Sequence, residues 1–200
     1  MSVIIVEDKG QQAGKHENKH RWFDCHDVEL LQAPLPVGDY ILYTEMVEDV
    51  IQRKAKRGVD LKKLDFLGSY KVCVDTKRDM TEIEGNICGK QHDRFKDECV
   101  LAQNNGIQLY VLVENQDGIS CLDDVPGWKN PRIERYEMIV SKHKEGKWKR
   151  VPEPKASPTA GKTLAKCMKT MQDRYGVKFL FCHPDEAGEH ILQLLTAQEE

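Results

Sequence analysis

The stretch Val72–Lys77, with the sequence VCVDTK, limits what this chain can fold into more than any other. Val72 and Val74 are β-branched residues spaced two apart, as on the buried face of a strand. The strand ends in an acid, a spacer and a lysine. Since residues two apart in a strand point the same way, Asp75 and Lys77 are predicted to share one face. By itself such a pair most simply forms a salt bridge at a strand end, and the case for any chemistry depends on what surrounds it.

Short apolar strands alternate with helical patterns along the chain, which predicts an α/β fold with a mixed central sheet flanked by helices. We expect strands at 2–6, 28–31, 38–42, 70–77, 107–114 and 177–182. We expect helices at 45–67, 92–105, 161–175 and 185–198. The clearest helix is 92–105, because Phe95, Cys99 and Ala102 form an apolar stripe at helical spacing. The pattern of residues 132–140 predicts no element.

The length of 200 residues suits a single domain, 1–200. Within it, residues 45–67 are predicted to be a helical insertion between the strands that carry Asp39 and Asp75. Residues 146–160 hold several prolines and are interpreted as a connector. Residues 161–200 are predicted to add a helix, a strand and a helix to the same domain.

The formal charge of −3 gives no overall basic footprint, so any contact with nucleic acid must use local positive surface. The strongest local excess of Lys and Arg runs from Lys142 to Lys169, although such charge runs are often merely solvated. The run that we expect to contact DNA lies in the insertion: Arg53, Lys54, Lys56, Arg57, Lys62 and Lys63.

No window reaches the apolar length of a membrane helix, and MSVIIVEDKG is not a signal peptide. The seven cysteines are scattered and odd in number. They fit free thiols in a reducing compartment better than a disulfide framework. The sequence therefore predicts a cytoplasmic protein without a membrane partner.

An acid stands at the end of each of three expected strands, at Glu7, Asp39 and Asp75, and the helix 92–105 then brings Arg94 and Glu98. The pieces that carry this order are "IIVED", "LPVGDYIL", "VCVDTK", "HDRFKDE", "LYVLVEN" and "GKTLAKCMKTMQDRYGVKFLFC". They span Ile4 to Cys182. Together they resemble the XPF-type structure-specific nucleases of the PD-(D/E)xK superfamily, above all the small phage and bacterial members that consist of the nuclease domain alone.

This resemblance implies a restriction-endonuclease-like sheet and metal-dependent cleavage of DNA, of branched or partly single-stranded form, in recombination, repair or replication. It places the protein in a bacterial or phage-infected cell. Members of the family often pair, so a homodimer is one expected state. A different class of function is a non-catalytic DNA-binding or partner-binding subunit, since one member of such a pair can lose its acids.

The chain departs from the family pattern GD…ERKxxxD. Asp75-Thr76-Lys77 replaces the ERK triplet, and a glutamine common on the helix is Glu98. The final aspartate would fall at Thr81, which leaves Asp79 and Glu82 as open alternatives.

The first acid could be Glu7 or Asp8. Alternation from Val3 and Ile5 places Glu7 on one strand face and Asp8 on the other, and we favour Glu7.

Phosphodiester hydrolysis uses a divalent metal to polarise the phosphate and activate water, and Mg²⁺ prefers oxygen ligands. By resemblance, Mg²⁺ or Mn²⁺ would bind Asp39, Asp75 and the carbonyl of Thr76, with Glu7 reached through a second metal or a water. Lys77 would orient the water or stabilise developing charge. The residues expected to carry catalysis are Asp39, Asp75, Lys77, Glu7, Arg94 and Glu98.

Two other motifs resemble a nucleotide-binding loop and a zinc site. Residues 156–163 are a relaxed Walker A match, but a phosphate loop follows a buried strand, and the preceding RVPEPK is polar and broken by proline. We therefore expect no nucleotide cofactor. His16, His20, Cys25 and His26 are residue types that bind zinc, but their spacing fits no zinc pairing that we can place.

Overall fold

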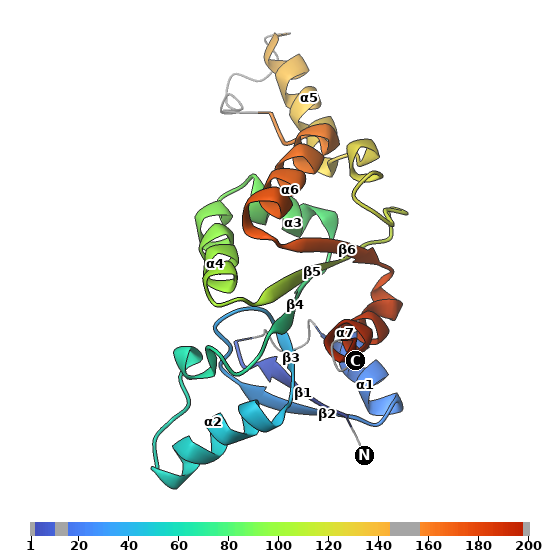
Figure 1. Cartoon of the computed structure of the whole chain (residues 1–200). Coiled ribbons are helices and arrows are strands. Elements are labelled where there is room, and N and C mark those ends of the chain that lie inside the picture. Colours follow the sequence, from blue (N-terminus) through green and yellow to red (C-terminus); the bar gives the residue numbers. More distant parts are fainter. Residues whose placement is uncertain (1–2, 11–15, 145–156, 198–200) are drawn as a thin grey trace.

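The computed structural model describes residues 3–10, 16–144 and 157–197, which form a mixed sheet flanked by helices (Figure 1). The strands are β1 (Val3–Asp8), β2 (Val28–Ala33), β3 (Tyr40–Leu42), β4 (Val72–Lys77), β5 (Gln108–Glu114) and β6 (Lys178–Cys182). They form a six-stranded sheet in the order β2-β1-β3-β4-β5-β6. The predicted α/β class with a mixed central sheet is confirmed.

One short strand runs against all the others. β1 is parallel to β2, and β4, β5 and β6 are parallel to one another, whereas β3 is antiparallel to both β1 and β4. The carboxyl ends of β1, β4 and β5 therefore lie at the same edge of the sheet as the amino end of β3. This edge brings together the residues that end those strands, Asp8, Lys77 and Glu114, and the residue that precedes β3, Asp39.

Two helices cover one face of the sheet. α1 (Glu17–Cys25) packs against α7 (Ala187–Thr196), and α7 contacts β3, β4 and β5. The core beneath them is built from alternate strand residues such as Ile5, Val74 and Leu112 together with Ile191 of α7. These strand residues point to this face because side chains alternate along a strand.

Four helices lie on the other face. They are α2 (Glu45–Lys56), α3 (Met80–Ile87), α4 (His92–Asn104) and α6 (Gly161–Tyr175). The predicted stripe of α4 is buried there, with Phe95, Cys99 and Ala102 each exposed by 2% or less. α5 (Pro131–Lys144) has no buried residue and extends away from the sheet (Figure 1).

Several elements differ from the sequence-based expectation. The insertion is helical only to Lys56 and then forms a loop with a short 3₁₀ turn, Lys63–Phe66. α3 is unexpected, and it begins because Asp79 accepts a hydrogen bond from the backbone N–H of Glu82 at 2.7 Å. α5 covers residues 132–140, for which the sequence pattern predicted no helix or strand. The last helix begins later than expected, after a 3₁₀ turn at Pro184–Glu186.

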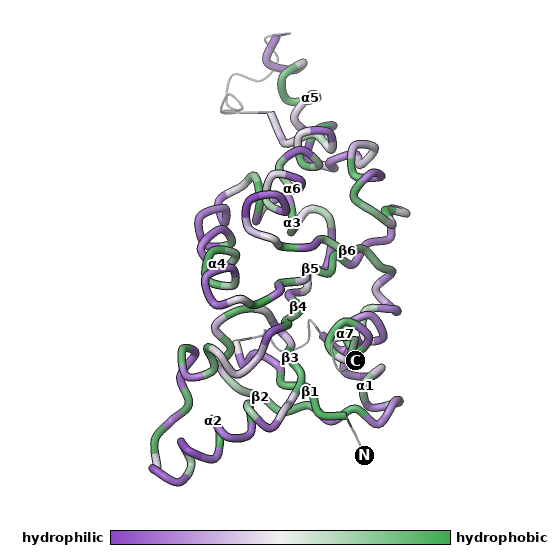
Figure 2. Tube along the Cα trace, viewed as in Figure 1, coloured by the Kyte–Doolittle hydropathy of each residue, from purple (hydrophilic) through white to green (hydrophobic). Residues whose placement is uncertain are grey.

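Most of the expected connector, 146–160, lies outside the described residues. The remaining expectations for 161–200 hold closely, since α6 begins and ends at the predicted residues, and Gly176 ends it with a φ of 70°. Figure 2 shows hydrophobic residues along β1 and β2 and alternation between hydrophilic and hydrophobic residues on the helices. All seven cysteines are free thiols. None of the helices in the described ranges has both the length and the apolar character needed to cross a bilayer.

The packing of α7 yields a stability prediction. Ile191→Ala should lower the free energy of unfolding by about 2–5 kcal/mol, because its fully buried side chain would leave a cavity under β3 and β4. Urea denaturation followed by circular dichroism measures the loss. Met46→Ala is the control, since Met46 is 58% exposed. Equal stability of the two variants would contradict the packing described for α7.

Candidate functional site

A polar cavity of about 840 Å³ opens at the sheet edge where β1, β4 and β5 end. It is lined by residues from the strand ends and from α1, α3 and α4. Its charged lining residues are Asp8, Lys19, Asp39, Lys63, Asp75, Lys77, Arg78, Glu82, Arg94, Asp97, Glu98, Glu114 and Arg132, and His16 also lines it. So many ionisable groups in one concave site make this edge the candidate functional site.

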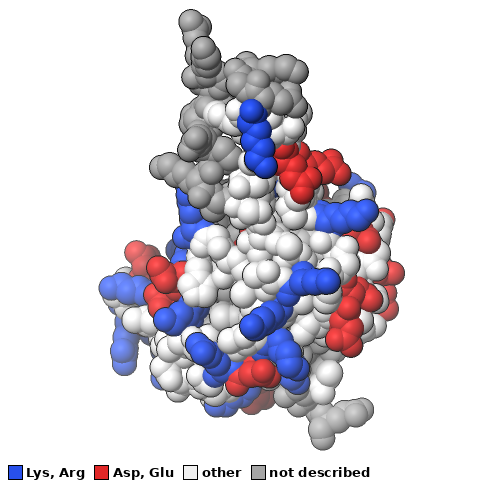
Figure 3. Space-filling model, turned by 90° about the horizontal axis from the view of Figure 1, so that it is seen from above, with Lys and Arg blue, Asp and Glu red and all other residues white. Residues whose placement is uncertain are grey.

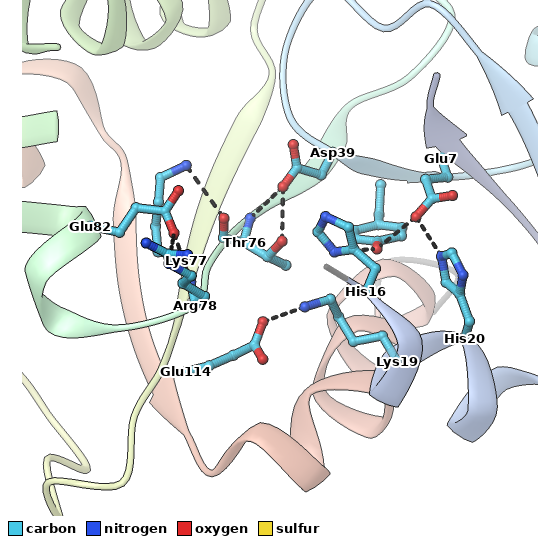
Figure 4. Close-up of polar contacts among 11 residues, drawn as sticks. Glu7, His16, Lys19, His20, Asp39, Thr76, Lys77, Arg78, Glu82 and Glu114 are labelled. Carbon is cyan, nitrogen blue, oxygen red and sulfur yellow. Dashed lines mark hydrogen bonds and ion pairs between the residues drawn. The ribbon is translucent and has the colours of Figure 1, made fainter. Parts of the chain in front are cut away.

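The backbone of Asp39 links β1 to β4. Its carbonyl accepts from the N–H of Asp8 at 2.8 Å, and its own N–H donates to the carbonyl of Val74 at 2.9 Å. The Asp39 carboxylate then accepts from both the backbone N–H of Thr76 at 2.8 Å and its hydroxyl at 2.9 Å (Figure 4). All of these bonds hold Asp39 beside the Asp75-Thr76-Lys77 triplet, as expected for acids on adjacent strands.

Asp75 and Lys77 share one face of β4 and form a buried ion pair. Their side chains are 5% and 7% exposed, and Lys77 Nζ lies 2.5 Å from Asp75 Oδ2. The Lys77 ammonium also lies 3.4 Å from the carbonyl oxygen of Thr76. A cation therefore already occupies the position next to the Asp75 carboxylate and the Thr76 carbonyl.

Burial and neighbouring charges shift both groups of this pair. Burial raises the pKa of Asp75 well above its usual range; Lys77 opposes this shift, and Asp39 and Glu98 add to it. Burial alone would lower the pKa of Lys77, but Asp75, Asp39 and Glu98 together raise it above its usual range. The neighbouring carboxylates thus keep Lys77 protonated.

Glu98 and Gly38 set the turn that leads into Asp39. Gly38 has a φ of 75°, and a Cβ on it would lie 2.8 Å from the Cβ of Cys73. Its N–H donates to Glu98 Oε1 at 2.9 Å, which ties α4 to the turn. Glu98 and Arg94, four residues apart, both line the cavity from α4.

The Thr76 carbonyl and the carboxylates of Asp39 and Asp75 are the oxygens that would hold the expected magnesium ion. In the part of the chain that the structure describes, no group of three or more His, Cys, Asp or Glu side chains is arranged for a metal. Asp39, Asp75 and the Thr76 carbonyl offer two carboxylates and one further oxygen, and Mg²⁺ is commonly held by one or two carboxylates with water in the other positions. Lys77 Nζ faces both the Asp75 carboxylate and the Thr76 carbonyl, so a metal ion at these oxygens would share them with the ammonium group.

Glu7 and Asp8 lie on opposite faces, and the structure places Asp8 at the cavity. Asp8 accepts from the N–H of Leu35 at 2.9 Å and pairs with Lys63 at 3.6 Å. Glu7 does not line the cavity; it is 1% exposed and faces α1. The prediction that Glu7 and Asp8 lie on opposite faces of the strand is correct. Asp8, however, is the residue on the same face as Asp39 and Asp75.

The alternatives for the last family aspartate also have places in the structure. Asp79 caps α3, and Glu82 accepts from the backbone N–H of Arg78 at 3.1 Å. Glu82 lines the cavity, and so does Thr81, while Asp79 does not.

A buried ion pair between Lys19 and Glu114 closes the α1 side of the cavity (Figure 4). Their side chains are 4% and 8% exposed, although 95 residues separate them in the chain. Sequence reasoning missed both. The available signal was the position of Glu114 at the end of an apolar strand, next in the sheet to the strand that ends at Lys77.

The basic residues of the insertion differ in their distance from the cavity. Lys63 lines it, whereas Arg53, Lys54 and Arg57 surround a separate small hollow with Asp65. Lys54 pairs with Asp65 at 2.7 Å, and Lys56, Arg57 and Lys62 are exposed. The face seen in Figure 3 mixes Lys and Arg with Asp and Glu rather than gathering them in one basic patch.

The two competing motifs have other roles in the fold. Gly161 begins α6, and residues 157–160 before it form no strand. A Cβ on Gly161 would lie 2.5 Å from the carbonyl oxygen of Val125, so this glycine serves close packing. Of the four zinc-type residues, His26 stacks on Trp22 with ring centres 3.9 Å apart, while His16 and His20 stack on each other.

The sequence matches no protein-family model, and no curated protein is significantly similar to it. The functional argument therefore depends on the geometry of the site.

The carboxylate pair predicts a response to divalent cations. Mg²⁺ at about 100 times its dissociation constant should stabilise the fold by about 2.7 kcal/mol, because the ion binds the assembled acids and not the unfolded chain. Thermal denaturation with and without Mg²⁺ measures this. Asp39→Asn should abolish the stabilisation, since it removes one ligand charge while its amide oxygen can still accept from Thr76. The exposed Asp123→Asn should respond as the wild type does, and an Mg²⁺ effect unchanged in Asp39→Asn would rule out this donor set.

Proposed function

We propose that this protein is a metal-dependent DNA endonuclease of the XPF type within the PD-(D/E)xK superfamily. The observation that carries the proposal is the placement of Asp39, Asp75 and Lys77 together at one sheet edge, inside a polar cavity. Asp39 immediately precedes β3, Asp75 lies in the adjacent antiparallel strand β4, and Lys77 follows Asp75 on the same face. Acid, acid and lysine in this order are what the resemblance of the sequence implies.

The residues of the site suit phosphodiester hydrolysis. Asp39, Asp75 and the carbonyl of Thr76 would hold Mg²⁺ or Mn²⁺, which supplies a Lewis acid that polarises the scissile phosphate. Lys77 remains an ammonium and stabilises the negative charge that develops on the phosphate oxygens. Glu98 positions Asp39 through the N–H of Gly38. Arg94, exposed on the rim of the cavity, can contact the phosphate that flanks the cleaved one.

Local positive surface would hold the DNA, because the chain carries a net negative charge. Lys63 at the cavity and the exposed Lys56, Arg57 and Lys62 of the insertion provide it. Contacts of this kind bind phosphates, so they fit selection by DNA structure rather than by sequence. The family resemblance adds branched or partly single-stranded DNA as the substrate class, and recombination, repair or replication in a bacterial or phage-infected cytoplasm as the setting.

The second candidate is a non-catalytic subunit that binds DNA or a partner in a nuclease complex. The complete set of Asp39, Asp75 and Lys77 favours an active enzyme, since a subunit without catalysis has no need of buried charges that are costly to retain. Cleavage of flap, fork, junction and single-stranded DNA by the pure protein, with and without Mg²⁺, separates the two functions.

Removing the charges of the site should stop cleavage. Asp75→Asn should abolish metal-dependent cleavage, because it removes a charged ligand at a strand end. Lys77→Ala should lower the rate by about 10²-fold or more, the scale for loss of a preorganised charge stabiliser. Single-turnover cleavage of a labelled branched DNA measures both rates. Asp60→Asn, an exposed acid in the insertion, is the control, and wild-type rates in the Asp75 and Lys77 variants would exclude this site.

Positive surface on the insertion should control the salt dependence of DNA binding. A variant with Lys56, Arg57 and Lys62 changed to alanine should bind more weakly and lower the log–log salt slope by about 0.9 for each lost phosphate contact on duplex DNA. Fluorescence anisotropy across a salt series measures the slope. The matched control changes three exposed lysines of α6, Lys162, Lys166 and Lys169, to alanine. A slope that falls in the α6 variant and not in the insertion variant would move the DNA-binding surface to α6.

A further inference from the structure

A chain of hydrogen bonds leads from a buried acid to an imidazole at the cavity. Glu7 Oε1 accepts from the hydroxyl of Tyr40 at 2.9 Å, and that hydroxyl lies 3.3 Å from Nδ1 of His16. Tyr40 and Glu7 are 0% and 1% exposed, whereas His16 lines the cavity. Figure 4 shows His16 between Lys19 and the Asp39–Thr76 pair, on the side of the cavity opposite Lys77.

The single proton of Tyr40 determines the tautomer of this histidine. Tyr40 donates that proton to Glu7, so its oxygen can only accept from His16. Nδ1 of His16 must then carry a proton. In the neutral imidazole this leaves Nε2 as the atom with a free lone pair. Glu7 is held in turn by Nε2 of His20 at 2.8 Å and by the side-chain amide of Gln32 at 3.4 Å. These two contacts fix the buried end of the hydrogen-bond chain.

Several other charged groups near His16 already have partners in the site. Lys77 is kept protonated by Asp75, Asp39 and Glu98. Asp39 and Asp75 form the donor set for a cation, and Lys19 is paired with Glu114. Among the described residues that line the cavity, His16 is the one histidine.

We propose that His16 is a catalytic residue of the cleavage reaction and accepts, at Nε2, the proton of the attacking water, with Tyr40 and Glu7 as positioning residues. This inference rests on the proposed nuclease function and adds a proton acceptor to it.

In this step the water oxygen forms a bond to phosphorus while its proton passes to Nε2 of His16. The bond from phosphorus to the leaving oxygen breaks, and its electron pair stays on that oxygen, which takes a proton from solvent. The products are a phosphate monoester and an alcohol. His16 then returns its extra proton to solvent, so no other reactant is needed.

The surroundings of His16 keep it neutral. Burial and the nearby Lys19 lower the pKa of His16 below 6.5, His20 lowers it further, and Asp39 and Glu7 act in the opposite direction. A neutral imidazole is the form that can accept a proton at physiological pH. The rate should therefore fall as pH decreases through this pKa, because protonated His16 has no lone pair to offer.

The tautomer can be measured without any cleavage. Long-range ¹⁵N–¹H spectra of the metal-free protein report which ring nitrogen of His16 carries the proton. We expect the Nδ1–H form in the wild type and a loss of that preference in Tyr40→Phe, which removes the acceptor but keeps the ring volume. An Nε2–H form in the folded wild type would overturn the inference.

Kinetics then tests the role in catalysis. At saturating Mg²⁺ and neutral pH, His16→Gln should cleave about 10²-fold or more slowly, the usual scale for a lost general base. It should also lose the decrease in rate that the wild type shows as pH falls through the His16 pKa. Glutamine can still donate to Tyr40, so the fold should be retained, which near-UV circular dichroism checks. His190→Gln on α7, away from the cavity, is the control.

The outcomes separate the two proposals. Cleavage that requires Asp75 but proceeds at the wild-type rate in His16→Gln would overturn the role of His16 and leave the nuclease function standing. A wild type that cleaves no DNA structure with Mg²⁺ or Mn²⁺ would remove the nuclease function and this inference with it. Partial restoration of His16→Ala cleavage by added imidazole, absent in Asp75→Asn, would support proton transfer at this position.

Discussion

The Asp39 backbone is hydrogen-bonded on both sides, to Asp8 of β1 and to Val74 of β4, and the site depends on this double pairing. β3 has three residues and runs against every neighbouring strand. Its reversal brings the start of β3, rather than its end, to the carboxyl ends of β1 and β4. The carboxylate of Asp39 consequently reaches Thr76 next to the buried Asp75–Lys77 pair. Gly38, in a left-handed conformation against Cys73 and hydrogen-bonded to Glu98, allows the chain to enter β3 at this point.

The cavity draws on both faces of the sheet. Asp8, Asp75 and Lys77 belong to the face covered by α4, while His16, Lys19 and Glu114 come from the side of α1 and α7. Side chains of adjacent strand residues diverge, so the two groups could meet only beyond the ends of the strands. Burying this many charges costs stability unless they are paired. Lys19 and Glu114 form one buried ion pair between distant segments, and Asp75 and Lys77 form another within β4. Concentration of such groups in one concave site is typical of functional centres.

The candidate site could be predicted where its residues lie on one strand or helix. Asp75 and Lys77 share a face because they are two apart in β4, and Arg94 and Glu98 share one because they are four apart in α4. The choice between Glu7 and Asp8 could not be made in this way. Side-chain alternation predicts that Glu7 and Asp8 lie on opposite faces of β1, but which face carries the cavity depends on the helices that pack there. The Lys19–Glu114 pair had no local signal either, since its members are 95 residues apart.

The sequence by itself determined the α/β class, most strand and helix positions, and the grouping of Asp39 with the Asp75-Thr76-Lys77 triplet. The class and the element positions follow from hydrophobic periods of about 2 and 3.6 residues, which are local properties of the chain, whereas the grouping of Asp39 with the triplet is what the family resemblance implies. The tertiary structure alone decided that β3 is reversed within an otherwise parallel sheet, that Asp8 faces the cavity while Glu7 holds Tyr40, and that His16 reaches the same cavity. Those features arise from hydrogen bonds and packing between distant segments, which no local pattern of residues records.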